Sequence, residues 1–585
     1  MLRCFLHAAL CVGVGIATLV GPTTGHAQTA VPGQVSGQVS GQVPSQVTPP
    51  SLRPTAPPNV PTLVLPGQPA TAVPDGDSTL TVLVGDVELE GAFAELAPAA
   101  ELVISRLRNR PLSVQQIYAA ATELERIYTE AGYVLARVVV PPQNLVDHGA
   151  LHLVVVDGFI EGIDVSALPE RVRAVVADRM IGLVGLRHLR LAELERALLV
   201  AGDVPGLKLK STLMRGGREG GVRLLLDGEH RLVSASVGGD DRLSSTLGTW
   251  QLRGAVALNS ALGTGEQIYA TGGLGADLHA AREGRSPLAI YGAGVIVPVG
   301  VDGLTINPEY THSTTRTPQA IGVPASLGTF ERFALRLREP ISLTRKASLY
   351  VNFSLEDVDQ QVAAPDFGTT LNHDHYGVFR AGPDLATTLP SGAGLQLSAL
   401  LSEGLGGRDA RDAAMSGVPL SRLGADPHFA KLSGNARISQ ALPAGFRLDL
   451  IGAAQSSFGK PLLRPEQIVL DGNDALSAFA SGTFSADQGM ALRSELSRAF
   501  GVEALHATVA PYVFGAAGRG WLATATSIEQ PAFNAGAVGL GVRGSVDSSA
   551  NQPGGSLTLE VARGYTDLSG VRRGWRANLI ASASY

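Results

Sequence analysis

The region from His230 to Tyr585 is a series of segments, each of roughly ten residues, in which apolar and polar side chains alternate. A period of two places successive side chains on opposite faces of a β-strand. The predicted strands begin at Arg231, Thr249, Glu266, Leu288, Gly303, Glu331, Ala347, His375, Gly394, Phe429, Gly445, Gln488, Glu503, Ala535, Gly555 and Gly574. Sixteen is an even number, as in single-chain bacterial membrane barrels. We therefore predict an all-β membrane fold, a sixteen-stranded transmembrane β-barrel over residues 230–585.

A soluble propeller or sandwich would show a similar period, and other features decide between these folds. The chain has 70 glycines, which suits curved barrel strands. The last strand, Trp575–Tyr585, alternates to its final residue and ends on an aromatic side chain. It resembles the terminal signal by which outer-membrane barrels are recognised for assembly, with Tyr where Phe is commoner. These features favour a membrane barrel.

The N-terminus has the pattern of an export signal. Arg3 precedes an apolar core, Ala8–Val20, and the small-x-small sequence Gly25-His-Ala27 follows. We predict a signal peptide over residues 1–27. Both cysteines lie inside it, so neither disulfides nor cysteine metal sites are expected in the mature chain.

Residues 28–77 consist of Gly-Gln-Val-Ser repeats followed by a Pro-rich stretch. Such a composition cannot bury enough apolar surface to offset the entropy lost on ordering. No helical apolar period runs through it, and proline interrupts it throughout. We predict a disordered linker.

Two similar units follow the linker, and each is predicted as a β-α-α-β-β domain from the switch between periods of 3.6 and two. The first, residues 78–157, has a strand at Thr79, helices around Ala99–Leu107 and Ser113–Ala131, and strands Val134–Val140 and Leu151–Val156. The second, residues 158–229, has a strand Phe159–Val165, helices Glu170–Met180 and Leu191–Ala201, and strands Leu207–Met214 and Gly221–Leu226.

Spaced motifs in these units resemble the two polypeptide-transport-associated (POTRA) domains of haemolysin secretion/activation proteins. The signature positions are Gly132, Tyr133, Pro141, Gln143, Asp203, Pro205 and Gly206. The resemblance implies an outer-membrane pore whose POTRA domains lie in the periplasm and recognise a secreted partner protein, typically an adhesin or a haemolysin. The partner would leave through the barrel, a process called two-partner secretion, and outer-membrane lipid would surround the barrel wall.

In a β-α-α-β-β sheet the second strand lies at an edge, where its backbone N–H and C=O groups can pair with an extended chain. We therefore predict that the partner binds along the two edge strands of the tandem. The positions in the first domain are Val134, Val138 and Val140, and those in the second are Leu207, Lys210 and Met214.

The longest break in the barrel alternation is residues 455–486, between the eleventh and twelfth predicted strands. Members of the resembled family place a loop there that folds into the pore. Its Val-Arg-Gly-Phe motif meets an aspartate in a Phe-x-Asp-x-Gly motif on the next strand but one. Here the loop motif is Leu476, Ser477, Ala478 and Phe479, and the wall motif includes Phe514, Ala516 and Gly518.

The arginine of that ion pair is thus replaced by Ser477 and the aspartate by Ala516. Losing both charges together costs far less than losing one, which would leave the other without a partner. We therefore expect the loop to be held by apolar contacts through Leu476 and Phe479, and by Arg493 and Glu495 on the wall.

The charge and the distribution of histidines exclude several classes of function. A net charge of −6 with 17% charged residues excludes a basic nucleic-acid binder. The twelve histidines are scattered and no catalytic frame is present, so we predict no enzyme activity, no cofactor and no metal. The alternatives are a barrel-assembly factor, whose relatives usually carry three or more POTRA domains, and a diffusion porin, which would leave the tandem unexplained. A monomer is expected. The family's pore-plugging N-terminal helix is not predicted in residues 28–77.

Overall fold

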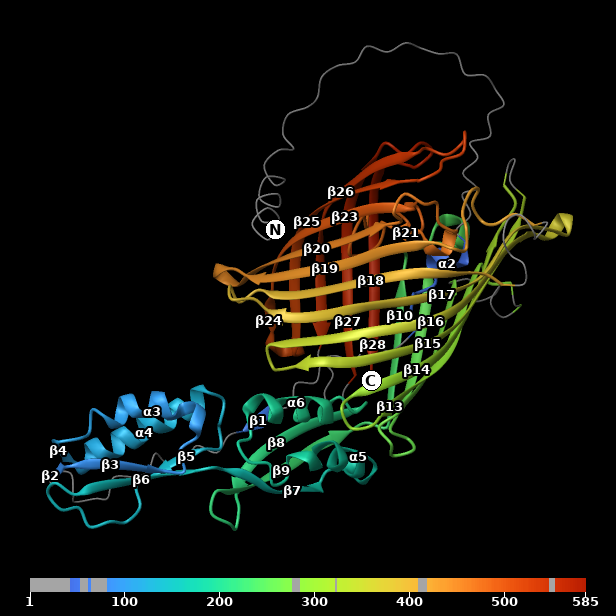
Figure 1. The fold of residues 1–585 in the computed structure, drawn as a ribbon. Helices are drawn as coiled ribbons and strands as arrows, with labels where there is room; N and C mark the ends of the chain where they lie inside the picture. Colours follow the sequence, from blue (N-terminus) through green and yellow to red (C-terminus); the bar gives the residue numbers. More distant parts are fainter. Residues whose placement is uncertain are drawn as a thin grey trace. The chain divides into compact units, whose positions relative to one another are not determined.

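The computed structural model describes residues 43–52, 62–64, 81–275, 283, 285–320, 324–408, 418–546 and 553–585. The predicted signal peptide, residues 1–27, and most of the predicted linker lie outside these residues. Figure 1 shows two small α+β domains and a closed barrel following one another along the chain. Within the described ranges, no helix is long and apolar enough to cross a membrane.

The first α+β domain packs two helices on a sheet of order β3-β6-β5. Its elements are β2 Thr81–Val84, β3 Asp86–Glu90, α3 Ala97–Ile104, β4 Arg110–Ser113, α4 Val114–Glu130, β5 Arg137–Val139 and β6 Ala150–Val156. Helix α4 begins at a capping box in which Ser113 and Gln116 accept each other's backbone N–H. It buries Ile117, Ala121 and Leu124 in the domain core. The strand predicted at Thr79 is divided at Gly85 into β2 and β3, and the four-residue strand β4, which pairs with β2, was not predicted because it is too short to show a period.

The second α+β domain contains β7 Phe159–Ala167, α5 Glu170–Met180, α6 Leu191–Gly202, β8 Leu207–Arg215 and β9 Gly221–His230. All five elements begin at the predicted residues. The sheet order is β1-β8-β9-β7, so β9 rather than β8 is flanked by two strands of the domain itself. The additional strand β1, Thr62–Val64, comes from the predicted linker and lies parallel to β8.

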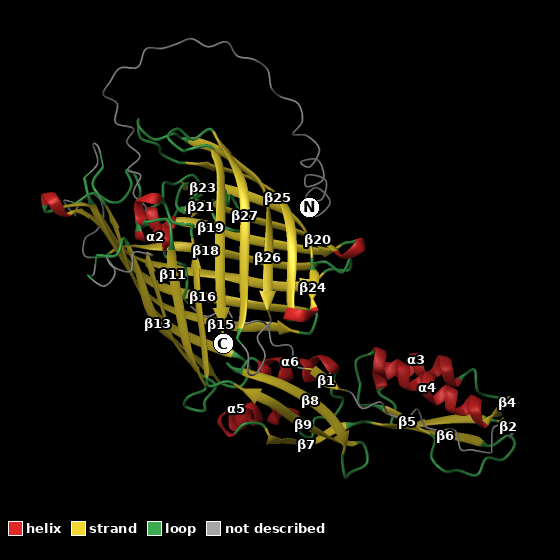
Figure 2. Ribbon diagram, turned by 180° about the vertical axis from the view of Figure 1, so that it is seen from behind, coloured by secondary structure: helices red, strands yellow, loops and turns green. Residues whose placement is uncertain are grey.

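The barrel wall closes through a continuous antiparallel ladder from β10 to β28 and back to β10. Its strands are β10 Val233–Asp240, β11 Gln251–Asn259, β12 Gln267–Gly275, β13 Leu288–Val299, β14 Leu304–Thr317, β15 Ser326–Leu343, β16 Ala347–Ala364, β17 Thr369–Thr388, β18 Gly394–Gly407, β19 Ala430–Ala441, β20 Phe446–Ser456, β23 Gln488–Arg498, β24 Phe500–Val502, β25 Ala507–Trp521, β26 Ala532–Val546, β27 Gly554–Thr566 and β28 Gly574–Ser584. Because β23 and β24 both pair with β25, they form one wall strand, and the wall has sixteen strands as predicted. Figure 2 shows the same wall from behind.

Side chains of the wall alternate between an apolar outer face and a mixed inner face. On β27, Leu557, Leu559 and Val561 are exposed on the outside. At alternate positions, Glu560 and Ala562 are buried on the inside. The outer face therefore suits contact with lipid, and polar groups gather in the lumen.

Residues 43–52 correct the prediction of a disordered linker without a helix. Pro44–Val47 form one helical turn, α2, and the segment contacts inward side chains of the wall. The backbone N–H of Ser45 donates to Gln360 at 3.2 Å, and that of Leu52 donates to Glu309 at 3.0 Å. A single turn has no apolar period, and its order comes from partners more than 250 residues away in the sequence.

Candidate functional site

The long connection between β20 and β23 folds back on itself inside the barrel. It contains a 3-10 turn, Arg464–Glu466, and a two-residue pairing of β21, Ile468–Val469, with β22, Ser485–Ala486. Asp471 closes the far end by accepting the backbone N–H groups of Gly482 at 2.8 Å and Phe484 at 2.9 Å. The loop is therefore a folded element.

An apolar cluster joins this loop to the inner face of the wall. The loop contributes Leu470, Leu476, Ala478, Phe479, Phe484 and Ala486, and the wall contributes Ala491, Tyr512, Phe514, Phe533, Ala535, Ala537 and Ala562. Glycines in the wall make room for two of the loop side chains. A Cβ at Gly518 would lie 3.1 Å from Leu476, and a Cβ at Gly564 would lie 2.6 Å from Phe479.

The loop tip is held by a guanidinium that comes from the wall. Nη1 of Arg493 on β23 donates to the hydroxyl of Ser477 at 2.9 Å. Nδ2 of Asn578 donates to the Ser477 backbone carbonyl at 2.8 Å. The Arg493 guanidinium lies 3.6 Å from the ring centre of Phe514, a cation–π distance. Ala516 pairs with Arg493 in the strand register and leaves this space open.

Arg493 is compensated by two carboxylates of the wall. Its Nη2 lies 2.7 Å from Glu560 and 3.2 Å from Glu495, and all three side chains are buried. Tyr512 also donates to Glu560 at 2.9 Å, and Arg543 lies 3.2 Å from Glu495. A buried charge needs such partners to offset its desolvation.

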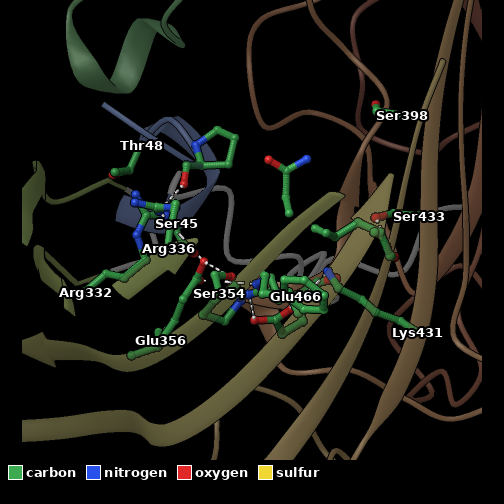
Figure 3. Close-up of a pocket in the computed structure, with 18 of the residues that line it drawn as sticks. Ser45, Thr48, Arg332, Arg336, Ser354, Glu356, Ser398, Lys431, Ser433 and Glu466 are labelled. Atoms are coloured by element: carbon green, nitrogen blue, oxygen red, sulfur yellow. Dashed lines mark hydrogen bonds and ion pairs between the residues drawn. The ribbon is translucent and has the colours of Figure 1, made fainter. Parts of the chain in front are cut away.

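A second polar anchor holds the start of the loop. The carboxylate of Glu466 takes a bidentate pair from Arg380 at 2.7 and 2.9 Å, an ion pair from Lys431 at 2.9 Å and a hydrogen bond from Tyr376 at 2.7 Å. Figure 3 shows Glu466 and Lys431 directed toward one another in the lumen. The three donors come from β17 and β19, whereas the wall residues of the apolar cluster come from β23 and β25–β27, so the loop is held on two sectors of the wall.

The N-terminal segment shares the lumen with the loop. Nε2 of Gln46 donates to the Ser485 hydroxyl at 2.8 Å. Arg332 and Arg336 donate to the backbone carbonyls of Pro49 and Pro50, each at 3.1 Å. Beside these groups lies a cavity of about 710 Å³, lined by Thr48, Arg336, Glu356, Lys431 and Glu466 among others (Figure 3).

The signature positions of the first domain have structural roles. Gly132 has φ +96° after α4, where a left-handed residue ends the helix. The Tyr133 hydroxyl donates to Glu95 at 2.6 Å and accepts from Arg190 at 3.0 Å. The hydrogen bond from Tyr133 lowers the pKa of Glu95 below its ordinary value. Gln143 bonds both backbone groups of His152 at 2.8 and 2.9 Å, which fixes the loop that begins at Pro141.

In the second domain Asp203 caps the end of α6, and Pro205 follows in the turn to β8. Gly206 has φ +78°, and a Cβ there would lie 2.3 Å from the Arg231 carbonyl. This turn therefore requires glycine for both reasons.

The first predicted partner-binding edge is shorter than expected. β5 covers only Arg137–Val139, so Val134 and Val140 lie outside it. Val134 packs against the core of the second domain. The backbone N–H of Val138 donates to Glu125 on α4 at 3.2 Å, so this edge donor already has a partner.

The second predicted edge is covered by the chain itself. Thr62, Leu63 and Val64 of β1 pair with Lys210, Ser211 and Thr212 of β8. Leu207 is buried and Met214 is 52% exposed beyond the paired residues. The prediction of an open edge at β8 is therefore wrong, because three linker residues add a strand to it.

Several site residues were not predicted. They are Glu560, Asn578, Arg543, Tyr512, Tyr376, Arg380, Lys431 and the segment 43–52. The signal for most of them is a polar residue on the inward position of an otherwise apolar strand. Within the described ranges no group of three or more His, Cys, Asp or Glu side chains could hold a metal ion.

Comparison with known proteins gives the family. Residues 222–544 match the family model described as haemolysin secretion/activation protein ShlB/FhaC/HecB, and residues 82–158 match the ShlB-type POTRA domain. The hemolysin transporter protein ShlB of Serratia marcescens is 26% identical over 466 residues, which are 77% of each chain. The outer membrane transporter CdiB of Escherichia coli is 25% identical over 233 residues, 39% of this chain and 37% of that one, so this match spans little more than a third of that relative.

Solved structures have the same fold. CdiB from Escherichia coli has a TM-score of 0.65 at 18% identity, over 88% of this chain and 92% of that one. CdiB from Acinetobacter baumannii has a TM-score of 0.58 at 17% identity, over 86% and 90%. The barrel lies in the outer membrane and the POTRA domains lie in the periplasm. With its barrel and a POTRA domain both matched, the chain belongs to the ShlB/FhaC/HecB family of haemolysin secretion/activation proteins.

Proposed function

We propose that this chain exports a secreted partner protein from the periplasm through its barrel. The observation that carries the proposal is that two segments outside the wall, residues 43–52 and the loop 457–487, occupy the lumen. Both are attached to the inner face of the wall by side-chain contacts, and neither adds a strand to the closed ladder. They can leave the lumen while the wall ladder stays paired, and this opens a path for an extended polypeptide.

The partner is received at the POTRA sheet edges. An extended chain adds to an edge by backbone hydrogen bonds, and this pairing depends little on which side chains the added strand carries. The β8 edge accepts such a strand once β1 has left, and the Val138 N–H donates to a carbonyl of the partner once Glu125 has turned away. Binding therefore competes with contacts inside the chain. The partner is a large secreted protein of the adhesin or haemolysin kind, and one chain suffices because its wall closes without a second copy.

The test is co-expression of the full chain with a candidate secreted partner, the partner being assayed in the culture supernatant. Deletion of this chain should abolish the extracellular partner while the amounts of other outer-membrane barrels stay normal. A fall in those barrels would instead identify an assembly factor. Unchanged secretion together with slower uptake of small solutes would identify a diffusion porin.

A further inference from the structure

The two ends of the barrel can be assigned from the chain path. The second POTRA domain ends at β9, and β10 follows it directly, so Val233 marks the periplasmic end of the barrel. Strands alternate in direction from there. The end of β25, the end of β27 and the start of β28 therefore lie at the extracellular end.

All three tryptophans of the chain lie at this extracellular end. Trp250 precedes β11, Trp521 ends β25 and Trp575 is the second residue of β28. Trp250 is 43% exposed and Trp575 is 69% exposed. Tryptophan gathers at the level of lipid headgroups because its ring is apolar and its N–H is polar. These residues mark the headgroup level of the outer leaflet.

Outward-facing arginines lie toward the extracellular ends of β25 and β27. Arg519 on β25 is exposed with its guanidinium 6.0 Å from the Trp521 ring centre. Arg563 on β27 lies 5.2 Å from the ring centre of Tyr565 and pairs in register with Trp575. The turn between β27 and β28 adds the exposed residues Arg572 and Arg573.

These four guanidinium groups have no carboxylate within ion-pair distance among the described residues. The carboxylate nearest to them in sequence is Asp567, which accepts hydrogen bonds from the Asn534 backbone and side chain at 2.7 Å each and also interacts electrostatically with Arg573. Below Arg563 the outer face of β27 continues with Val561, Leu559 and Leu557. The sector therefore presents positive charge above an apolar surface.

The opposite sector of the wall carries different charged groups at its extracellular end. On β14 to β17 the outward residues form His–carboxylate pairs, with His312 at 3.1 Å from Glu331, His373 at 2.8 Å from Asp359 and His375 at 3.3 Å from Asp357. Carboxylates there repel an anionic headgroup. One exposed arginine, Arg316, lies on the outside of β14, whereas β25–β28 and the turn after β27 carry four.

We propose that the outer face of β25–β28 binds the phosphorylated headgroup of an outer-leaflet glycolipid, lipid A, through Arg519, Arg563 and Arg573. Guanidinium groups form bidentate hydrogen bonds with phosphate oxygens. The acyl chains lie against the apolar residues below, and the aromatic rings of Tyr565 and Trp575 cover the sugar. The arginines attract the negatively charged phosphates of this lipid, and they lie toward the outer-leaflet headgroups. Both features favour it over the zwitterionic phospholipids of the inner leaflet.

The test uses the purified full chain in detergent and native mass spectrometry with bis-phosphorylated lipid A. The wild type should retain lipid A at a half-saturating concentration about tenfold lower than that of dephosphorylated lipid A. The triple variant Arg519→Gln, Arg563→Gln, Arg573→Gln should lose this preference. The matched control is Arg498→Gln, an outward arginine beside Phe446 and Phe500 at the periplasmic end, and it should bind like the wild type.

Two further arms complete the design. Inorganic phosphate at millimolar concentration should not displace lipid A, because it lacks the acyl chains that contact the wall. Heat-modifiable migration on a gel verifies that each variant is a folded barrel. The proposal is overturned if the folded triple variant binds lipid A as tightly as the wild type, or if removing the phosphates leaves wild-type affinity unchanged.

Discussion

The guanidinium of Arg493 on the wall and the hydroxyl of Ser477 on the loop tip are joined by a 2.9 Å hydrogen bond. In the family arrangement that the sequence resembles, the arginine belongs to the loop and its acceptor to the wall. Here the cation belongs to the wall, and Glu495 and Glu560 compensate it there. At this contact the loop contributes the neutral Ser477 side chain, and the charge belongs to the wall.

Ser477→Ala should therefore weaken the attachment of the loop tip to the wall only modestly. It removes one hydrogen bond to a charged donor, worth about 1.5–3 kcal/mol before relaxation, while Arg493 keeps both carboxylates. We expect single-channel recordings in planar bilayers to show more frequent openings with unchanged open conductance.

Arg493→Met should be far more damaging. It leaves Glu495 and Glu560 buried without their shared cation, a loss of about 3–5 kcal/mol. We expect lower yields of folded barrel and a loop that proteases cleave. A variant that is as stable as Ser477→Ala would contradict the role assigned to Arg493.

Glu466→Gln should release the start of the loop, since Arg380 and Lys431 lose a shared carboxylate that is 1% exposed. Asp474→Asn is the matched control, because Asp474 pairs with Arg437 at 2.8 Å but is 69% exposed. An exposed pair contributes about 0–1 kcal/mol. Conductance and antibiotic entry should rise for Glu466→Gln and remain near wild type for Asp474→Asn. Equal behaviour of the two variants would mean that the lumen anchor does not hold the loop.

A cross-link between β1 and β8 should stop export. Leu63→Cys and Ser211→Cys are register partners, and the mature chain is predicted to contain no other thiol. Oxidation would fix β1 on the edge that the partner needs, and a reductant should restore secretion. The single-cysteine variants serve as controls. Secretion that persists with the cross-link formed would show that the partner does not use β8.

Glu125→Ala should strengthen partner binding at β5, because it frees the Val138 N–H for an incoming carbonyl. Glu123→Ala on the same helix is the control, as Glu123 pairs with Arg106 at an exposed site. Binding of an extended partner peptide to the full chain can be compared by fluorescence anisotropy. A decrease in affinity for Glu125→Ala alone would indicate that Glu125 helps to shape the edge.

Sequence patterns predicted the strands in which apolar and polar residues alternate along the whole length. The strands starting at Leu288, Ala347, Gly394, Gln488 and Gly574 begin at the predicted residues. β15 and β17 begin five and six residues earlier than predicted, at Ser326 and Thr369. Their early residues extend beyond the apolar outer band, where neither face needs apolar side chains and the alternation disappears.

The lumen contacts depend on partners that no local pattern reveals. α2 is one turn long, β1 is three residues long, and each is ordered by residues far along the chain. Arg493 and Glu560 are 67 positions apart, and their pairing follows from strand order around the closed wall. Ser477 and Ala516 could be identified as departures from the family motif, but the cation that replaces the missing arginine could be located only in three dimensions.

The N-terminal stretch is attached at two places, inside the lumen up to Leu52 and on the POTRA sheet from Thr62. Ten peptide units separate these attachments, so the tether between them can never exceed about 35 Å. A partner strand that displaces β1 would free Thr62–Val64, and a partner that then draws this segment away from the barrel would pull on residues 43–52. If the partner binds at β8 as proposed, we expect its arrival at the periplasmic sheet to exert tension along the backbone on residues 43–52 in the lumen.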